Sequence, residues 1–222
     1  RSSYHFFYYP IMLFYCYCLS KRSKINHIYT SLGDLPYLNI IDLNKTILTA
    51  AASCGIKKIE KRIEKLKKIK KIVVESNKQN EELLKLGINP NKIKVIYPSV
   101  NLEEFNYQKA KGEFNILYAS CPTRLSDFKK RGINLIIETA KKDQSSKFML
   151  AWREGAYLDI KKLINKSSLK NVMINNKIVN NMNEIYGQAH CTIIPYTKYD
   201  DYLKLIPNSA LESLAAGKPI LV

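Results

Sequence analysis

The stretch "FNILYASCPTRLSDFKKRGINLIIETAKK", residues 114–142, decides the fold class. It opens with an apolar run at 114–120, which is typical of a buried β-strand. A polar and basic loop follows at 121–132, and residues 133–142 have the character of a helix. A strand that passes through a loop into a helix is the repeating unit of a parallel sheet with covering helices. The stretch therefore predicts an α/β protein.

The same alternation extends along most of the chain. The linker is expected at 101–113, which is polar and irregular, and it suggests domains at 1–104 and 105–222. Two parallel sheets with covering helices are therefore expected. Strands are predicted within 24–34, 45–52, 71–76, 91–100, 114–120, 147–152, 171–179, 190–197 and 218–222, and helices at 35–43, 56–72, 78–87, 133–142, 157–165, 181–189 and 208–217.

The chain is strongly basic. Its 222 residues contain 36 Lys and Arg against 19 Asp and Glu, a net charge of +17. Such an excess fits anionic lipid, a phosphate-bearing ligand, nucleic acid, or merely a solvated Lys-rich surface. Nucleic acid is the last of these, because no element interleaves aromatic and basic residues. We expect no nucleic-acid partner.

Cysteine and histidine usage predicts neither disulfides nor a metal site. The five cysteines form no CxxC pair and most lie in apolar runs, which is typical of reduced thiols in a cytosolic protein. His5, His27 and His190 are isolated from one another. We therefore expect no metal and no cofactor, and we expect His190 to be structural and His27 to be the better cleft residue.

Two segments allow a contact with membrane. The aromatic and apolar run "HFFYYPIMLFYCYCL", residues 5–19, is shorter than the about 20 residues that span a bilayer. We interpret it as a buried helix or strand, with a membrane-surface anchor as the alternative. Helix 56–72 carries nine Lys and Arg residues, which form either a solvated basic face or a face for anionic membrane.

Two loops hold the side chains that suggest binding chemistry, because ligands of open parallel sheets bind beyond the carboxyl ends of the strands. The basic loop provides Arg124, Lys129, Lys130 and Arg131, which suit a diphosphate or are simply solvated. The second loop leads into helix 208–217, where Asn208 and Ser209 would cap a helix N-terminus that attracts anions. Glu212, one turn further on, would grip the vicinal hydroxyls of a ribose or would only favour the helix dipole.

Residues 73–222 resemble the retaining, nucleotide-sugar-dependent glycosyltransferases of family 4, which have the GT-B fold of two Rossmann-like domains. "VVESNKQNEELLKLGINPNKIKVIYPSVNLEEF" is similar to that family's interdomain region, and the loop at 121–132 resembles its Gly-Arg-Leu…Lys-Gly loop. "NNMNEIYGQAHCTIIPY" and "PNSALESLAAGKPILV" resemble the segments that lead to and form the donor helix. The resemblance implies a transferase that moves a sugar from a nucleotide-sugar to a glycan or lipid-linked acceptor.

The resemblance also implies roles for individual residues. Arg124 and Lys130 would be catalytic, since they would neutralise the diphosphate as negative charge builds on it, with Arg131 as the alternative to Lys130. Glu212 would hold the ribose, and the backbone at Ile178 or Val179 would meet the base. The donor-binding residues implied are Arg124, Lys130, Arg131, Ile178, Pro207, Asn208, Ser209 and Glu212.

The sequence departs from the family pattern at two positions. Lys204 stands eight residues before Glu212, where the family has its first glutamate, although Asp200 or Asp201 would be a substitute. Thr123 replaces the glycine before Arg124. A catalytically silent nucleotide-sugar-binding domain is therefore the alternative function. We further expect an incomplete N-terminal domain, a truncated C-terminal end, and a cytoplasmic location, with the peripheral inner face of the membrane as the variant.

Overall fold

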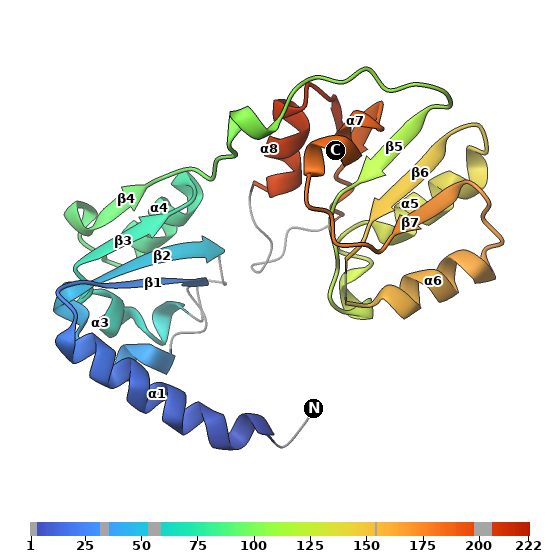
Figure 1. Cartoon of the computed structure of the whole chain (residues 1–222). Coiled ribbons are helices and arrows are strands. Elements are labelled where there is room, and N and C mark those ends of the chain that lie inside the picture. Colours follow the sequence, from blue (N-terminus) through green and yellow to red (C-terminus); the bar gives the residue numbers. More distant parts are fainter. Residues whose placement is uncertain (1–3, 32–35, 53–58, 154, 198–205) are drawn as a thin grey trace. The chain divides into compact units, whose positions relative to one another are not determined.

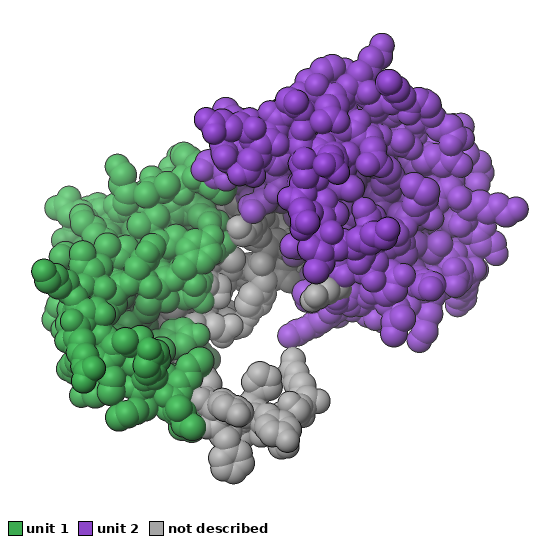
Figure 2. Space-filling model, in the orientation of Figure 1, with its two compact units in different colours: residues 1–98, 201–205 green, residues 99–200, 206–222 purple. Residues whose placement is uncertain are grey.

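Two parallel β-sheets organise the chain (Figure 1). A computed structural model describes residues 4–31, 36–52, 59–153, 155–197 and 206–222. The chain divides into two units between Pro98 and Ser99, a few residues ahead of the predicted boundary (Figure 2).

Unit 1, which precedes Ser99, contains a four-stranded parallel sheet in the order β1-β2-β3-β4. Alternate strand residues such as Leu48, Ala50, Ile72 and Val74 are buried together on one face, as the two-residue period of a strand requires. Its strands are β1 (Asn26–Ser31), β2 (Thr46–Ala52), β3 (Lys71–Val74) and β4 (Ile93–Val95), and its described helices include α1 (Tyr4–Arg22), α3 (Ile63–Leu66) and α4 (Asn77–Lys85).

The N-terminal apolar run forms helix α1, but the prediction that it is buried is wrong for its described side chains. Ile11 is 65% exposed and Phe14 is 69% exposed. Apolar residues surround this helix instead of forming one stripe, so packing one side against the unit cannot bury them all. Within the described ranges, no helix is both long and apolar enough to cross a membrane.

The long amphipathic helix predicted at 56–72 is also wrong. Residues 56–58 lie outside the described residues, α3 ends at Leu66, and β3 begins at Lys71. The apolar positions Ile59, Leu66, Ile69 and Ile72 are nevertheless fully buried. A helix, a turn and a strand bring these residues into one core. The apolar spacing therefore predicted which residues are buried but not the secondary structure that contains them.

Shorter differences occur elsewhere in unit 1. The helix expected at 35–43 is replaced by two 3-10 turns, η1 (Pro36–Asn39) and η2 (Leu43–Lys45). Helix α4 begins at Asn77, one residue before the predicted start at 78, and the Ser76 hydroxyl caps it by accepting a hydrogen bond from the backbone N–H of Gln79 at 3.2 Å.

Unit 2 contains a five-stranded, all-parallel sheet in the order β7-β6-β5-β8-β9. From β5 the chain moves outward to one edge, and it then returns to place β8 on the other side of β5. The strands are β5 (Asn115–Tyr118), β6 (Lys147–Ala151), β7 (Val172–Asn175), β8 (Cys191–Ile193) and β9 (Ile220–Leu221), and the helices are α5 (Ile133–Lys142), α6 (Tyr157–Lys166), α7 (Met182–Gly187) and α8 (Asn208–Ala215). The predicted α/β class with two parallel sheets is confirmed.

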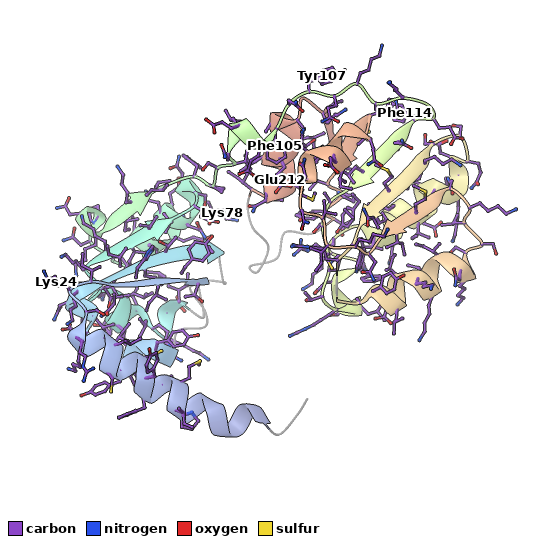
Figure 3. The ribbon with its side chains drawn as sticks, in the orientation of Figure 1. Lys24, Lys78, Phe105, Tyr107, Phe114 and Glu212 are labelled. Carbon is purple, nitrogen blue, oxygen red and sulfur yellow. The ribbon has the colours of Figure 1, made fainter. Side chains whose placement is uncertain are left out.

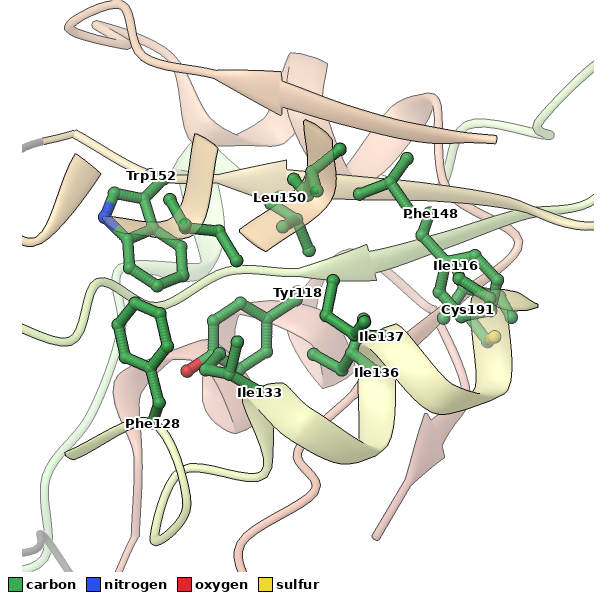
Figure 4. Close-up of a cluster of buried hydrophobic side chains, with 14 residues drawn as sticks. Ile116, Tyr118, Phe128, Ile133, Ile136, Ile137, Phe148, Leu150, Trp152 and Cys191 are labelled. Carbon is green, nitrogen blue, oxygen red and sulfur yellow. The ribbon is translucent and has the colours of Figure 1, made fainter. Parts of the chain in front are cut away.

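Each face of this second sheet has its own core. Tyr118, Phe148 and Trp152 pack against α5 and α6 on one face (Figure 4). Leu117 and Met149, the intervening strand residues, pack on the other face with Tyr186 of α7. Trp152 directly follows the last residue of β6, is buried, and donates a hydrogen bond from Nε1 to the Gly155 carbonyl at 2.8 Å.

The polar segment 99–113 is irregular apart from the short turn η4 (Leu102–Glu104), yet it packs along α7 and α8. Phe105 contacts Tyr186 edge-on with ring centroids 6.2 Å apart, and Asn106 exchanges hydrogen bonds with Asn183. Lys218 donates to the Gln108 carbonyl. These contacts explain why the segment belongs to unit 2.

Gly132 joins the loop after β5 to the chain leaving β8. It has φ +69°, and an added Cβ would lie 1.7 Å from the Pro195 carbonyl oxygen. Thr197 donates from its backbone N–H to the Lys130 carbonyl at 3.1 Å and from its hydroxyl to the Lys129 carbonyl at 2.7 Å. We call these contacts the β5–β8 seam.

We predict that Gly132→Ala destabilises unit 2 by about 3 kcal/mol or more, because it adds a steric clash with backbone to the cost of a left-handed residue. Gly112→Ala is the matched control, since Gly112 has φ +80° and no described atom within 4 Å of an added Cβ. That control should cost about 1–2 kcal/mol. Urea unfolding of both variants measures the difference, and equal losses would show that the seam is absent.

Candidate functional site

A pocket of about 570 Å³ opens at the carboxyl edge of the unit 2 sheet, beside the N-termini of α7 and α8. Segment 99–105 forms its other wall. The described residues that line it include no Lys or Arg. Its polar lining is mostly amide and carboxylate, with the one hydroxyl of Ser99: Asn101, Asn180, Asn181, Asn183, Asn208, Glu103, Glu104 and Glu212. Such a surface suits a ligand part rich in hydroxyl and N–H groups.

Glu212 is held in this pocket by Tyr186. The buried Tyr186 hydroxyl lies 3.0 Å from Glu212 Oε2, where it donates a hydrogen bond, and 3.2 Å from the Ser209 carbonyl oxygen. Phe105 packs on the same tyrosine ring, and Figure 3 shows Phe105 and Glu212 at the α8 side of the unit. The hydrogen bond from Tyr186 to Oε2 therefore orients the half-buried Glu212 carboxylate without a ligand.

Burial raises the pKa of Tyr186 well above its ordinary value of 10.0, and the nearby Glu212 charge and hydrogen bond add to this. An ionised phenol beside a carboxylate would place two negative charges together in a poorly solvated position. Tyr186 therefore stays protonated and remains a hydrogen-bond donor to Glu212.

The basic loop lies at the carboxyl ends of β5 and β8. The guanidinium of Arg131 donates from Nη1 to the Tyr196 hydroxyl at 2.8 Å and to the Ser120 hydroxyl at 3.2 Å. Lys130 is half-buried and its backbone carbonyl takes part in the seam. Arg124 is exposed and precedes the short turn η5 (Leu125–Asp127).

The start of α8 differs from the expectation. Pro207 is the N-cap residue, with φ −67° and ψ 140°, so the prediction that Asn208 and Ser209 cap the helix is wrong. Asn208 is exposed and lines the pocket, whereas Ser209 is buried. The rigid proline sets the extended entry into the helix and leaves Asn208 within the first turn.

The structure brings together some of the sequence-predicted residues. Asn208 and Glu212 line one pocket, and Arg131 lies on the β5–β8 seam. Arg124, Lys130 and Arg131 are not among the residues that line that pocket. Ile178 is 83% exposed in the loop between β7 and α7. Lys204, Asp200 and Asp201 fall outside the described residues.

Sequence reasoning missed the two tyrosines that hold the charged residues, Tyr186 and Tyr196. It also missed the amide lining of the pocket, although the run of asparagines at 175–183 was a visible signal. The pairing of a tyrosine with a particular charge depends on contacts between segments far apart in the chain. No local sequence pattern predicts such a pair.

His27 and His190 each contact a residue of a neighbouring strand. His190 accepts a hydrogen bond at Nδ1 from the Asn115 backbone N–H at 3.0 Å, as expected of a structural residue. His27 is exposed and lies 2.8 Å from the Thr49 hydroxyl through Nε2. In the described part of the chain, Cys16, Cys18, Cys121 and Cys191 form no disulfide, and no three His, Cys, Asp or Glu side chains cluster as metal ligands would.

No protein-family model matches the sequence, and neither does any curated protein sequence. Solved structures do match. Sucrose-phosphate synthase from Thermosynechococcus elongatus superposes with a TM-score of 0.69 at 15% identity, over 95% of this chain and 59% of that one. The Anabaena protein HepE, in complex with UDP and glucose, gives a TM-score of 0.69 at 12% identity, over 92% and 61%.

A third similar structure is an S. aureus TarM variant in complex with UDP, α-GlcNAc-glycerol and fondaparinux. Its TM-score is 0.66 at 18% identity, over 92% of this chain and 43% of that one. At these identities the likeness establishes the fold, which is the GT-B fold. The chain spans 59–61% of the length of the first two neighbours.

The Tyr186 hydroxyl should stabilise unit 2, and its raised pKa sets the pH range of the effect. At neutral pH we expect Tyr186→Phe to cost about 1.5–3 kcal/mol of unfolding free energy, the value of a hydrogen bond to a charged group. Below pH 10 the folded and unfolded chains both keep the phenol proton. Above it the unfolded chain releases the proton first, so stability falls as the pH rises.

The decrease in unfolding free energy with rising pH should be less steep in Tyr186→Phe than in the parent chain. Burial also raises the pKa of Tyr118, so part of the slope remains. Chemical unfolding at several pH values up to about 11 measures the slope. Tyr97→Phe is the control, because Tyr97 is 53% exposed. A parent slope matched by the Tyr186→Phe chain would refute the assignment.

Proposed function

We propose that the chain acts in sugar transfer from a nucleoside diphosphate sugar, and that unit 2 binds the nucleotide half of this donor. The observation that carries the proposal is the carboxylate of Glu212, oriented by Tyr186 in a pocket without basic lining, together with a cationic loop at the carboxyl ends of strands of the same sheet. A nucleoside diphosphate has the same division, with neutral hydroxyls and base at one end and charged phosphates at the other.

The pocket suits the nucleoside. Tyr186 occupies Oε2 of Glu212, which leaves Oε1 to accept from a pair of vicinal ribose hydroxyls. The asparagine amides of the α7 N-terminus supply both donors and acceptors, as the edge of a base requires. The backbone near Ile178 would meet this base from the exposed loop.

The basic loop and the α8 N-terminus suit the diphosphate. Arg131 is a planar fork at the carboxyl ends of β5 and β8, and Arg124 and Lys130 belong to the same loop. The backbone of Pro207, Asn208 and Ser209 forms the start of α8, whose dipole favours an anion. The HepE structures contain UDP or UDP-glucose, which supports this class of ligand.

In the proposed reaction, the bond between the anomeric carbon and the diphosphate oxygen breaks, and the electron pair leaves with the diphosphate. An acceptor hydroxyl forms the new bond to that carbon and gives up its proton. Arg124 and Lys130 stabilise the charge that builds on the leaving diphosphate, with Arg131 beside them. The reaction needs no metal or cofactor in this account, since cationic side chains carry out the neutralisation.

The finer assignments come from the resemblance at residues 73–222. On these assignments the chain is part of a family 4 enzyme that retains the anomeric configuration and uses a glycan or lipid-linked acceptor. Its location is cytoplasmic, with a peripheral contact with anionic membrane. The alternative is a catalytically silent nucleotide-sugar-binding domain, which Lys204 in place of a glutamate favours. Both alternatives share the nucleotide site of unit 2.

We expect Glu212→Ala and Arg124→Ala to weaken nucleoside diphosphate binding by about 10- to 100-fold each, because each removes a charge-assisted hydrogen bond. Calorimetric titration with UDP, GDP and ADP measures the change. The matched controls are Glu138→Ala and Lys142→Ala, two exposed charges of α5 on the opposite face of the sheet, which should leave affinity unchanged.

Unchanged affinity for the bound nucleotide in both site variants would exclude this site. Activity then separates the two functions. With UDP-glucose and GDP-mannose as donors, a transferase releases nucleoside diphosphate above the uncatalysed rate when glycan or lipid acceptors are supplied. A binding domain would bind nucleotide yet release nothing.

A further inference from the structure

The chain leaving β8 turns back onto the basic loop. The backbone N–H of Tyr196 bonds to the Ile194 carbonyl at 2.9 Å, which closes a three-residue turn. Thr197 is then fixed to the carbonyls of Lys129 and Lys130 by two hydrogen bonds. Hydrogen bonds therefore fix the backbone at Tyr196 and at Thr197, the next residue. Because the backbone is fixed there, the direction in which the Tyr196 side chain leaves it is fixed as well.

The Arg131 guanidinium is held by that side chain. Nη1 bonds to the Tyr196 hydroxyl at 2.8 Å and to Ser120 at 3.2 Å, and the guanidinium carbon lies 5.3 Å from the centre of the tyrosine ring. Nε is buried and has no hydrogen-bond partner among the described residues. Nη2 likewise makes no hydrogen bond to a described residue, so this end of the fork is the one left to meet a ligand.

We propose that Tyr196 is a positioning residue for Arg131, holding its guanidinium at the carboxyl ends of β5 and β8 so that Nη2 meets the donor's diphosphate. The inference rests on the proposed function, because it assumes that unit 2 binds a nucleoside diphosphate. A long cationic side chain loses rotamer freedom when it binds a ligand. Arg131 has lost that freedom already, so binding does not incur this loss again.

A purely structural tie between two loops is the competing explanation, and it makes a different prediction. A structural tie would stabilise the whole edge, so its loss would weaken every ligand of the site alike. A positioning residue acts through Arg131 on the phosphates alone. The preference for nucleoside diphosphate over nucleoside monophosphate therefore distinguishes the two.

The experiment titrates the full chain with three matched pairs, UDP and UMP, GDP and GMP, and ADP and AMP, and continues with the pair that binds. Tyr196→Phe keeps the ring and removes the hydroxyl. We expect it to lower diphosphate affinity about tenfold and monophosphate affinity by less than about threefold. Tyr107→Phe is the control, since this 66% exposed tyrosine packs on Gly217 away from Arg131.

Arg131→Ala and the double variant complete a cycle. If Tyr196 acts through Arg131, Tyr196→Phe has no further effect on the preference once Arg131 is alanine. Arg131→Lys, which keeps the charge without the fork, guards against an alanine variant that fails to fold. Thermal unfolding of each variant confirms that the folded chain is being titrated.

The outcomes are distinct. A wild-type chain that binds none of the diphosphates overturns the proposed function and this inference with it. If the wild type binds and Arg131→Ala loses the preference, but Tyr196→Phe retains it, the inference is overturned and the proposed function stands. Equal weakening of diphosphate and monophosphate by Tyr196→Phe also overturns the inference, since it indicates a structural tie.

Discussion

The reversal of strand order between β5 and β8 is the constraint on which the unit 2 site depends. Among the described strands of this sheet, the connections from β5 to β6, from β6 to β7 and from β8 to β9 each join neighbouring strands, and only the connection from β7 to β8 does not. At the reversal, the loop after β5 and the chain after β8 leave adjacent strands in different directions, which opens the sheet edge to ligands. The Gly132–Pro195 approach and the Thr197 hydrogen bonds keep the two exits in contact despite this.

The charges at that edge are segregated. Carboxylates and amides gather around the pocket between segment 99–105, α7 and α8, whereas the cations lie on the loop after β5. In both places a tyrosine fixes the charged group: Tyr186 holds the carboxylate and Tyr196 holds the guanidinium. Phenol hydroxyls suit both tasks, since they donate to an anion and accept from a cation. Such a site suits a ligand that has a neutral, hydroxyl-rich part and an anionic part, because its charged side chains are oriented before the ligand binds.

Local pattern was sufficient for much of the fold. The strand–loop–helix unit at 114–142 and the strand predicted at 147–152 both follow from short-range rules of period and burial. The rules failed where tertiary structure decides. The apolar spacing at 56–72 fits a helix, but its residues reach one core through a helix, a turn and a strand. The tyrosine partners of Glu212 and Arg131 lie 26 and 65 residues away in sequence, beyond the reach of any local pattern.

A crystal structure of the chain with a nucleoside diphosphate tests the central claim most directly. The account predicts ribose hydroxyls within hydrogen-bonding distance of Glu212 Oε1, and phosphate oxygens within hydrogen-bonding distance of Arg131 at the β5–β8 edge. A nucleotide bound elsewhere, or one whose phosphates enter the Glu212 pocket while its ribose lies on the basic loop, would contradict it.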